Sequence, residues 1–126
     1  PDLDKAFAGL VTDLDQRGML DSTLVLVTSE FGRTPGPLNF ILGRDHHKHV
    51  FPAMFAGAGI KGGQMYGSTD EFGYAAVENR VSVPDLHATL LHLFGLDPKK
   101  LSYKRNGVDQ ILVENPLARV VSEILA

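Results

Sequence analysis

The spacing of apolar residues in the first segment is typical of an amphipathic helix. Over residues 2–19, the large apolar side chains recur at steps of one, three and four, which places them on one helical face. These residues are Leu3, Phe7, Leu10, Val11 and Leu14. The opposite face is charged, so we expect a helix whose apolar stripe packs on a core.

Two more helices and a hairpin are predicted in the second half of the chain. Residues 81–95 carry a leucine-rich face, and residues 117–126 repeat the helical spacing after an Asn-Pro pair that suits a helix start. Between them, Asn106-Gly107 is a two-residue turn signal, which predicts a hairpin over residues 103–113.

Two apolar runs are predicted to be strands. Residues 23–28 are almost continuously apolar and β-branched, as in a strand that is buried on both faces of a parallel sheet. Residues 51–56 form the second run. The succession of helix, short turn and buried strand predicts an α/β fold, with a mostly parallel sheet flanked by helices, in a single domain over residues 1–126.

Composition narrows the functional classes. The chain has 126 residues, 44% of them hydrophobic, which is enough for one core. Its formal net charge of −3 argues against nucleic acid as a partner. No apolar run is long enough to span a membrane, and the lack of cysteine excludes disulfides and thiolate chemistry. Because the chain opens directly in helical periodicity, we expect it to be a piece of a longer protein.

Candidate chemistry begins where the first predicted strand ends. Ligands of open α/β sheets bind beyond the carboxyl ends of the strands, and Glu30 lies just after residues 23–28. A partly desolvated carboxylate is costly unless it meets a cation or a metal. Glu30 is therefore a candidate metal ligand, and the alternative is an ion pair with Arg33 or Arg44.

A long loop then leads to a cluster of histidines. Residues 31–48 contain several glycines and prolines, and a loop of this length is uncommon in a compact domain unless it has a function. Asp45, His46, His47 and His49 offer the carboxylate and imidazole groups that zinc and similar ions favour. Adjacent side chains diverge, so at most two would bind one ion. The alternative is a hydrophilic loop without a metal.

Other motifs give weaker signals. His87 and His92 lie five positions apart, which is not the spacing that puts two imidazoles on one helical face. His87 lies near a helix start and is a candidate for the strand-end site, with a packing role as the favoured alternative. Residues 57–63 are glycine-rich but lack the spacing of a phosphate-binding loop. No GxSxG motif surrounds Ser29 as a nucleophile.

Four sequence blocks together resemble one protein family. Residues 29–35, SEFGRTP, resemble the EFGRTP signature of the DUF1501 family, and residues 43–46 match its GRDH. Residues 57–63, GAGIKGG, are similar to its glycine-rich block. Residues 85–91, DLHATLL, are similar to its DLHATLLHLLGLD segment. The blocks occur in the family's order and cover roughly residues 10–103.

The resemblance implies the C-terminal portion of a sulfatase-like protein of the alkaline phosphatase superfamily. Members of that superfamily have a mostly parallel sheet between helices. They hydrolyse phosphate or sulfate esters, usually with two divalent metals and a Ser, Thr or formylglycine nucleophile. By this resemblance Glu30 and His46 are metal ligands, and Asp45 is a weaker candidate. The metal would be zinc, calcium, magnesium or manganese.

The resemblance also suggests catalytic residues, a substrate and a partner. Arg33 or Arg44 would clamp the oxyanion of the ester, and His87 is the third catalytic candidate. The substrate would be a small-molecule or polysaccharide ester, and the location would be exported or periplasmic. The nucleophile and the upstream ligands would lie N-terminal to Pro1, so the N-terminal remainder of the same protein is the expected partner.

Two positions depart from the superfamily pattern. Phe31 occupies the place of a metal-binding histidine, and its ring cannot bind a metal. Glu30 stands where the superfamily has aspartate. A metal site needs three or four ligands held together. We therefore expect these 126 residues alone to bind metal weakly and to show little hydrolase activity.

Two functional hypotheses follow. The first is the C-terminal part of a metal-dependent hydrolase of sulfate or phosphate esters, incomplete and inactive alone. The second is a non-enzymatic binding or assembly module on a degenerate hydrolase scaffold, for which Phe31 is the best support. A third and weaker hypothesis is that the chain is a self-contained small metal-binding domain.

Overall fold

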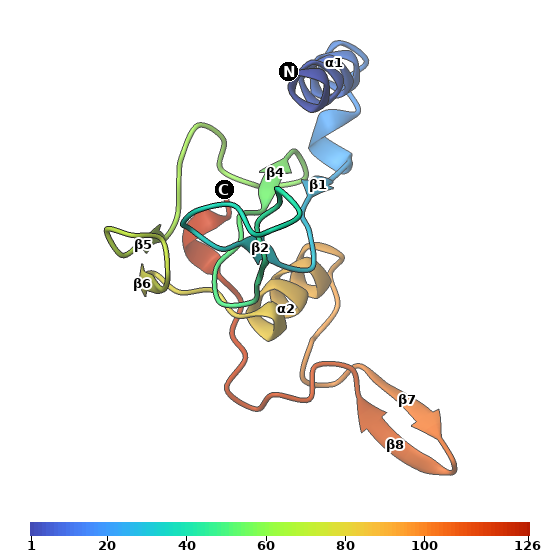
Figure 1. Cartoon of the computed structure of the whole chain (residues 1–126). Helices are drawn as coiled ribbons and strands as arrows, with labels where there is room; N and C mark the ends of the chain where they lie inside the picture. Colours follow the sequence, from blue (N-terminus) through green and yellow to red (C-terminus); the bar gives the residue numbers. More distant parts are fainter. The chain divides into compact units, whose positions relative to one another are not determined.

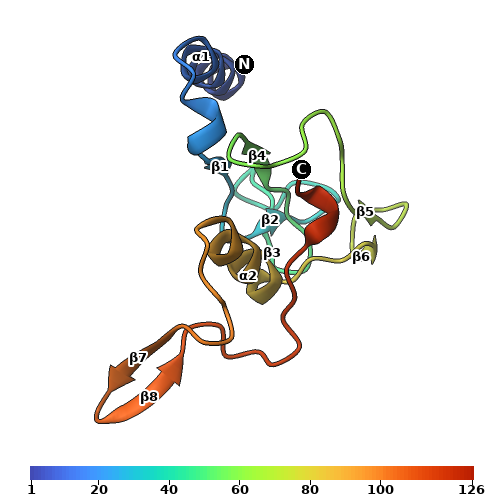
Figure 2. The same cartoon turned by 180° about the vertical axis from the view of Figure 1, so that it is seen from behind.

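The computed structural model describes all residues from 1 to 126. The chain forms two compact units, Pro1–Arg80 and Val81–Ala126, and each is described by itself. Figure 1 shows the elements coloured along the sequence, and Figure 2 shows them from behind. No helix is both long enough and apolar enough to cross a membrane.

The first unit contains one α-helix, one short 3₁₀ helix and three pairs of strands. The elements are α1 (Asp2–Gln16), η1 (Leu20–Ser22), β1 (Val25–Val27), β2 (Gly32–Arg33), β3 (His46–His47), β4 (Met54–Ala56), β5 (Ser68–Thr69) and β6 (Ala76–Glu78). Each strand has one antiparallel partner, so the pairs are β1–β4, β2–β3 and β5–β6. In Figure 1, α1 leads through η1 into β1, with β4 beside β1.

The first predicted helix is confirmed, but its apolar stripe does not pack on a core as expected. It ends one turn before residue 19, because Gly18 takes a φ of 66° and the Met19 N–H then donates to the Leu14 carbonyl at 2.8 Å. This is the usual way in which a glycine ends a helix. None of the α1 residues is buried, and Leu3 and Leu10 on its apolar stripe are exposed.

The expected α/β fold, with a mostly parallel sheet flanked by helices, is wrong. The structure has two α-helices and four separate two-stranded antiparallel sheets, and it contains no part of an alkaline-phosphatase-like parallel sheet. Parallel neighbours need a crossover, usually a helix. The chain between β1 and β4 holds no helix and returns antiparallel, with Leu26 opposite Phe55. The apolar run of β1 is therefore only half-buried.

The second unit contains α2 (Val83–Leu93), β7 (Ser102–Arg105), β8 (Val108–Ile111) and η2 (Ser122–Ile124). The helix and the hairpin are confirmed. Asn106 and Gly107 have φ values of 53° and 80°, as expected for a two-residue turn that matches the twist of the strands. In Figures 1 and 2 the hairpin projects away from α2, and all four residues of β7 are exposed.

The predicted helix over residues 117–126 is wrong, because other groups take its backbone donors. The Leu117 N–H donates to the Asn115 side chain at 2.9 Å. The N–H groups of Arg119 and Val121 donate to the side chains of Asp85 and Thr89, each at 2.9 Å. Only the short η2 forms. Side chains of α2 therefore replace the hydrogen bonds that a terminal helix would make within itself.

The fully buried part of the molecule is small. Ala88 and Val121 are the buried hydrophobic side chains, and Thr89 and His47 are the buried polar ones. In the second unit, Ala88, Thr89 and Val121 lie where α2 meets the C-terminal segment, as the Thr89–Val121 hydrogen bond shows. In the first unit the buried residue is His47, on β3.

Candidate functional site

The strand pair β2–β3 holds the residues that the sequence singled out. Gly32 pairs with His47, and Arg33 pairs with His46. The Thr34 N–H donates to the Asp45 carbonyl at 3.0 Å and extends the pairing. A Cβ atom at position 32 would collide with the carbonyl oxygen of Val50, so only glycine fits there. The glycine of the EFGRTP block thus lets the backbone at Val50 approach β2 closely.

His47 lies on the inner side of the pair and is only 7% exposed. Its Nε2 lies 3.1 Å from the Tyr74 carbonyl oxygen, which can only accept, so the proton is on Nε2. Its ring also makes edge contacts with Tyr74 and His49. The Tyr74 hydroxyl in turn donates to the Pro35 carbonyl at 3.2 Å. His47 is therefore a packed residue that anchors the loop.

His46 is exposed and stacks on Phe31. The ring centroids lie 3.6 Å apart with an interplanar angle of 19°. The Arg33 guanidinium carbon lies 5.3 Å from the centroid of the same phenyl ring, within the range of a cation–π contact. Phe31 thus contacts both register partners and fixes the plane of the imidazole. Phe31 therefore has a packing role.

The two arginines differ in how firmly they are held. Arg33 Nη1 donates to the Arg44 carbonyl at 3.0 Å, in addition to the contact with Phe31. No hydrogen bond or ion pair holds the Arg44 side chain, which is exposed. Arg33, Arg44, Asp45 and His46 line one open hollow on the surface, together with residues of the preceding loop. These four predicted site residues are brought together.

Asn39 organises that preceding loop. Its side-chain oxygen accepts from the N–H groups of Ile41 at 3.1 Å and Gly43 at 3.0 Å, and its Nδ2 donates to Asp45 Oδ1 at 2.9 Å. Its backbone N–H donates to the Gly43 carbonyl at 2.7 Å. Nothing in the sequence pattern singled out Asn39. The only signal was its place in a turn, where asparagine side chains often bond the backbone nearby.

Glu30 is exposed and forms no ion pair with Arg33 or Arg44. It does not line the hollow, whereas Asp45 and His46 do. No group of three or more His, Asp or Glu side chains lies close enough together to hold a metal ion. Glu30, Asp45 and His46 therefore do not fit a metal centre by themselves in this arrangement.

His87 lies on α2 in the second unit, and its side chain is exposed without a hydrogen bond. That His87 acts in catalysis together with Arg33 and Arg44 stays a prediction. Two other residues of the same DLHATLL block carry the contacts. Asp85 accepts from Ser82 N–H at 2.8 Å, from Ser82 Oγ at 2.7 Å and from the Arg119 N–H. Thr89, one turn later, donates to the Asp85 carbonyl at 2.7 Å and accepts from the Val121 N–H.

Asp85 also has a shifted pKa. Partial burial raises the pKa of this carboxyl group. The hydrogen bonds from Ser82 and Arg119, together with the positive charge of Arg119, lower the pKa by a larger amount. The net pKa lies below the ordinary value of 3.8. Asp85 therefore stays ionised near neutral pH and serves as a cap and a tether.

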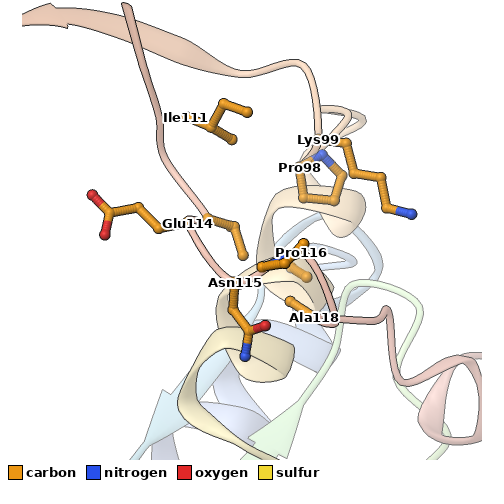
Figure 3. A pocket seen from close by; sticks show the side chains of 9 residues that line it. Pro98, Lys99, Ile111, Glu114, Asn115, Pro116 and Ala118 are labelled. Carbon is orange, nitrogen blue, oxygen red and sulfur yellow. The ribbon is translucent and has the colours of Figure 1, made fainter.

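A separate cavity of ≈ 240 Å³ lies in the second unit. Figure 3 shows Pro98 and Lys99 on one side and Ile111, Glu114, Asn115, Pro116 and Ala118 along the other. The charged ends of Lys99 and Glu114 point away from the other labelled side chains in Figure 3. The lining is therefore mainly apolar and offers no set of groups for catalysis or metal binding.

The chain belongs to the DUF1501 family, because residues 1–125 match the family described as "Protein of unknown function (DUF1501)". The match covers nearly the whole chain and confirms the family that the four motif blocks predict. The comparisons with curated proteins and with solved structures found no match.

Proposed function

We propose that this chain carries the anion-binding part of a hydrolase of sulfate or phosphate esters. The observation that supports the proposal is the hollow beside β2–β3, which is lined by Arg33, Arg44, Asp45 and His46. Guanidinium groups make the planar, bidentate contacts that sulfate and phosphate oxygens favour. Because Asp45 offsets one of the two guanidinium charges, the hollow keeps a net positive charge and attracts anions.

The two arginines would have different roles. Arg33 is held by the Arg44 carbonyl and by Phe31, so it offers a fixed set of donors. The Arg44 side chain has no such restraint and can turn toward the ester oxygens. Donors directed at those oxygens would stabilise the charge that develops on them during hydrolysis. His87 as a further catalytic group remains part of the proposal by resemblance alone.

A divalent metal belongs to the proposal through the sulfatase-like resemblance. It would polarise the ester and activate a nucleophile. Asp45 and His46 would each contribute one ligand from the hollow, and further ligands would have to come from an N-terminal remainder of the protein. That remainder would also supply the nucleophile, and the location would be exported or periplasmic. Glu30 does not line the hollow, so its predicted role as a ligand would require a different arrangement of this segment.

The alternative function is a non-enzymatic module that binds an anion without turnover. The observation that favours it is the stacking of His46 on Phe31 at 3.6 Å, because this contact uses the place of a metal-binding histidine for packing. Both functions need the arginines, and they differ only in whether a bound ester is cleaved.

Binding and turnover separate the possibilities. Inorganic phosphate and sulfate are titrated calorimetrically into the wild-type protein, Arg44→Gln and the control Arg80→Gln, another exposed arginine of the first unit. We expect affinity to fall about tenfold in Arg44→Gln only, because charged hydrogen bonds contribute on the order of 1.5–3 kcal/mol. Equal affinity in all three proteins would contradict the anion site.

Turnover is then measured with 4-nitrophenyl phosphate and 4-nitrophenyl sulfate, with and without added zinc or manganese. Hydrolysis that is lost in Arg44→Gln supports the hydrolase. Anion binding that depends on Arg44, without hydrolysis by the protein including any N-terminal remainder, supports the binding module.

A further inference from the structure

The loop that forms one wall of the hollow presents large apolar side chains to solvent. Phe40, Ile41 and Leu42 follow one another and are 96%, 72% and 80% exposed. Leu38, two residues earlier, is 56% exposed. Four large exposed apolar residues thus lie within five positions of the chain, and gathered apolar exposure in folded proteins usually marks a binding site.

The exposure results from a defined loop conformation. The Asn39 side-chain oxygen accepts from the N–H groups of Ile41 and Gly43. The Asn39 backbone N–H donates to the Gly43 carbonyl, and the Leu42 N–H donates to the Asn39 carbonyl at 3.0 Å. These hydrogen bonds hold the turn together while its apolar side chains are exposed. Leu42 has a φ of 59°, a left-handed conformation that is costly for leucine. The loop therefore holds its apolar side chains outward at some conformational cost.

The same loop is tied to the charged side of the hollow. Asn39 Nδ2 donates to Asp45 at 2.9 Å, and Asp45 lies between Arg44 and His46 in the chain. Leu38, Ile41 and Leu42 line the hollow together with Arg33 and Arg44. The hollow is therefore lined by the apolar wall, which is Leu38, Ile41 and Leu42, and by the two arginines. The Asn39 side chain links the apolar loop to the charged residues, because it bonds the loop backbone and Asp45.

We infer that this hollow binds anions that carry an apolar group, such as aryl or alkyl esters of phosphate or sulfate. The anionic group lies against Arg33 and Arg44, and the apolar group lies against Leu38, Ile41 and Leu42. This inference rests on the proposed anion site and adds the class of ligand. The charge of the arginines decides the occupant, because a neutral apolar ligand would leave the Arg44 guanidinium group without an acceptor.

The test compares ligands that share an anionic group and differ in apolar area. Inorganic phosphate, methyl phosphate and 1-naphthyl phosphate are titrated calorimetrically into the wild-type protein and the double variant Ile41→Ser/Leu42→Asn. Asparagine adopts the left-handed conformation of position 42 more readily than leucine, so the turn is retained. The control Met65→Gln removes another apolar side chain of the first unit, 97% exposed, that does not line the hollow.

We expect 1-naphthyl phosphate to bind about tenfold more tightly than inorganic phosphate, because burying about 60 Å² of apolar surface has roughly that effect. The double variant should lose this advantage and keep its affinity for inorganic phosphate. Met65→Gln should leave both affinities unchanged.

Other results would overturn the inference in distinguishable ways. Equal affinity for the three phosphates would exclude the apolar wall and leave the anion site intact. Binding of 1-naphthyl phosphate that survives Arg44→Gln, or no binding of any phosphate, would also contradict the proposed function. Binding to phosphatidylglycerol vesicles without binding of 1-naphthyl phosphate would assign the loop to a lipid surface instead.

Discussion

The β2–β3 loop (residues 32–47, including both strands) and helix α2 each contain a family sequence block, but they use their polar residues in opposite ways. On α2, Asp85 and Thr89 bond the backbone of a segment more than 30 residues away, and Thr89 is buried. In the loop, Arg44 and His46 lie at the surface of a hollow. The Arg44 side chain has no partner within the protein.

The difference shows which motif residues hold the fold and which are available to a ligand. A polar side chain whose bonding capacity is used by the backbone, such as Asp85, has a structural role that its sequence block does not reveal. A charged side chain without a partner, such as Arg44, is the better candidate for recognition. The comparison predicts that substitutions on α2 change stability with little effect on anion binding, and that most substitutions in the loop do the reverse.

The largest expected effect would break this division, because Gly32 serves both fold and site. In Gly32→Ala the new Cβ would meet the Val50 carbonyl oxygen, so β2 and β3 would have to separate. We expect a local destabilisation of about 3 kcal/mol and loss of phosphate binding. Hydrogen exchange at the Thr34 and His47 amides measures the first effect and calorimetry measures the second.

Gly9→Ala is the matched control, since nothing lies within 4 Å of a Cβ at that position. Gly9 is in the middle of α1, where alanine should add about 0.5–1 kcal/mol of stability. Protection at His47 that is unchanged in Gly32→Ala would show that the close approach to Val50 is not needed for the loop.

A second substitution sharpens the comparison from the side of α2. Thr89→Val keeps the shape of the side chain and removes the hydroxyl that bonds both Asp85 and Val121. The buried Val121 N–H then has no acceptor, so we expect unfolding in urea to become easier by about 2 kcal/mol. Phosphate affinity should not change. Thr89→Ser keeps the hydroxyl and should retain slow hydrogen exchange at Val121. Equal exchange rates in the two variants would contradict the role of the hydroxyl.

Local patterns in the sequence were enough to predict the elements that are stabilised within themselves. The helical spacing of Leu3, Phe7 and Leu10 predicted α1, and the Asn106-Gly107 turn signal predicted the β7–β8 hairpin. The four site residues that line the hollow come from one stretch of chain, so their proximity also followed from the sequence. The family was likewise evident from the motif blocks and is confirmed over residues 1–125.

The parts that could not be predicted depend on contacts between distant residues. The apolar run at β1 is compatible with parallel or antiparallel pairing, and only its pairing with β4 decides between them. Residues 117–126 have helical spacing, but Asp85 and Thr89 take two of their N–H groups. The stacking of Phe31 on His46 could not be predicted either, because it depends on the β2–β3 register. Sequence spacing carries none of this long-range information.

The smallest expected effect tests whether the Asp85 tether works through its charge. The pKa of Asp85 is lowered in the folded protein, so its carboxylate adds stability above pH 3.8, its ordinary pKa, and this stability is lost as the pH falls through the lower folded-state pKa. Asp85→Asn keeps the shape but cannot carry the charge. Near pH 6 we expect the variant to be less stable by about 1 kcal/mol, the upper end of what a negative charge in the first turn of a helix contributes.

That difference should shrink as the pH falls, because protonated Asp85 resembles asparagine. Urea unfolding of both proteins between pH 6 and pH 2.5 measures it. The pKa of Asp97 is also lowered, chiefly by a hydrogen bond from the Lys99 backbone, but this group is present in both proteins and cancels in the difference. A difference that stays constant over the whole range would mean that α2 holds Arg119 by geometry alone. The contrast with the proposed anion-binding hollow beside β2–β3 would then be sharper still.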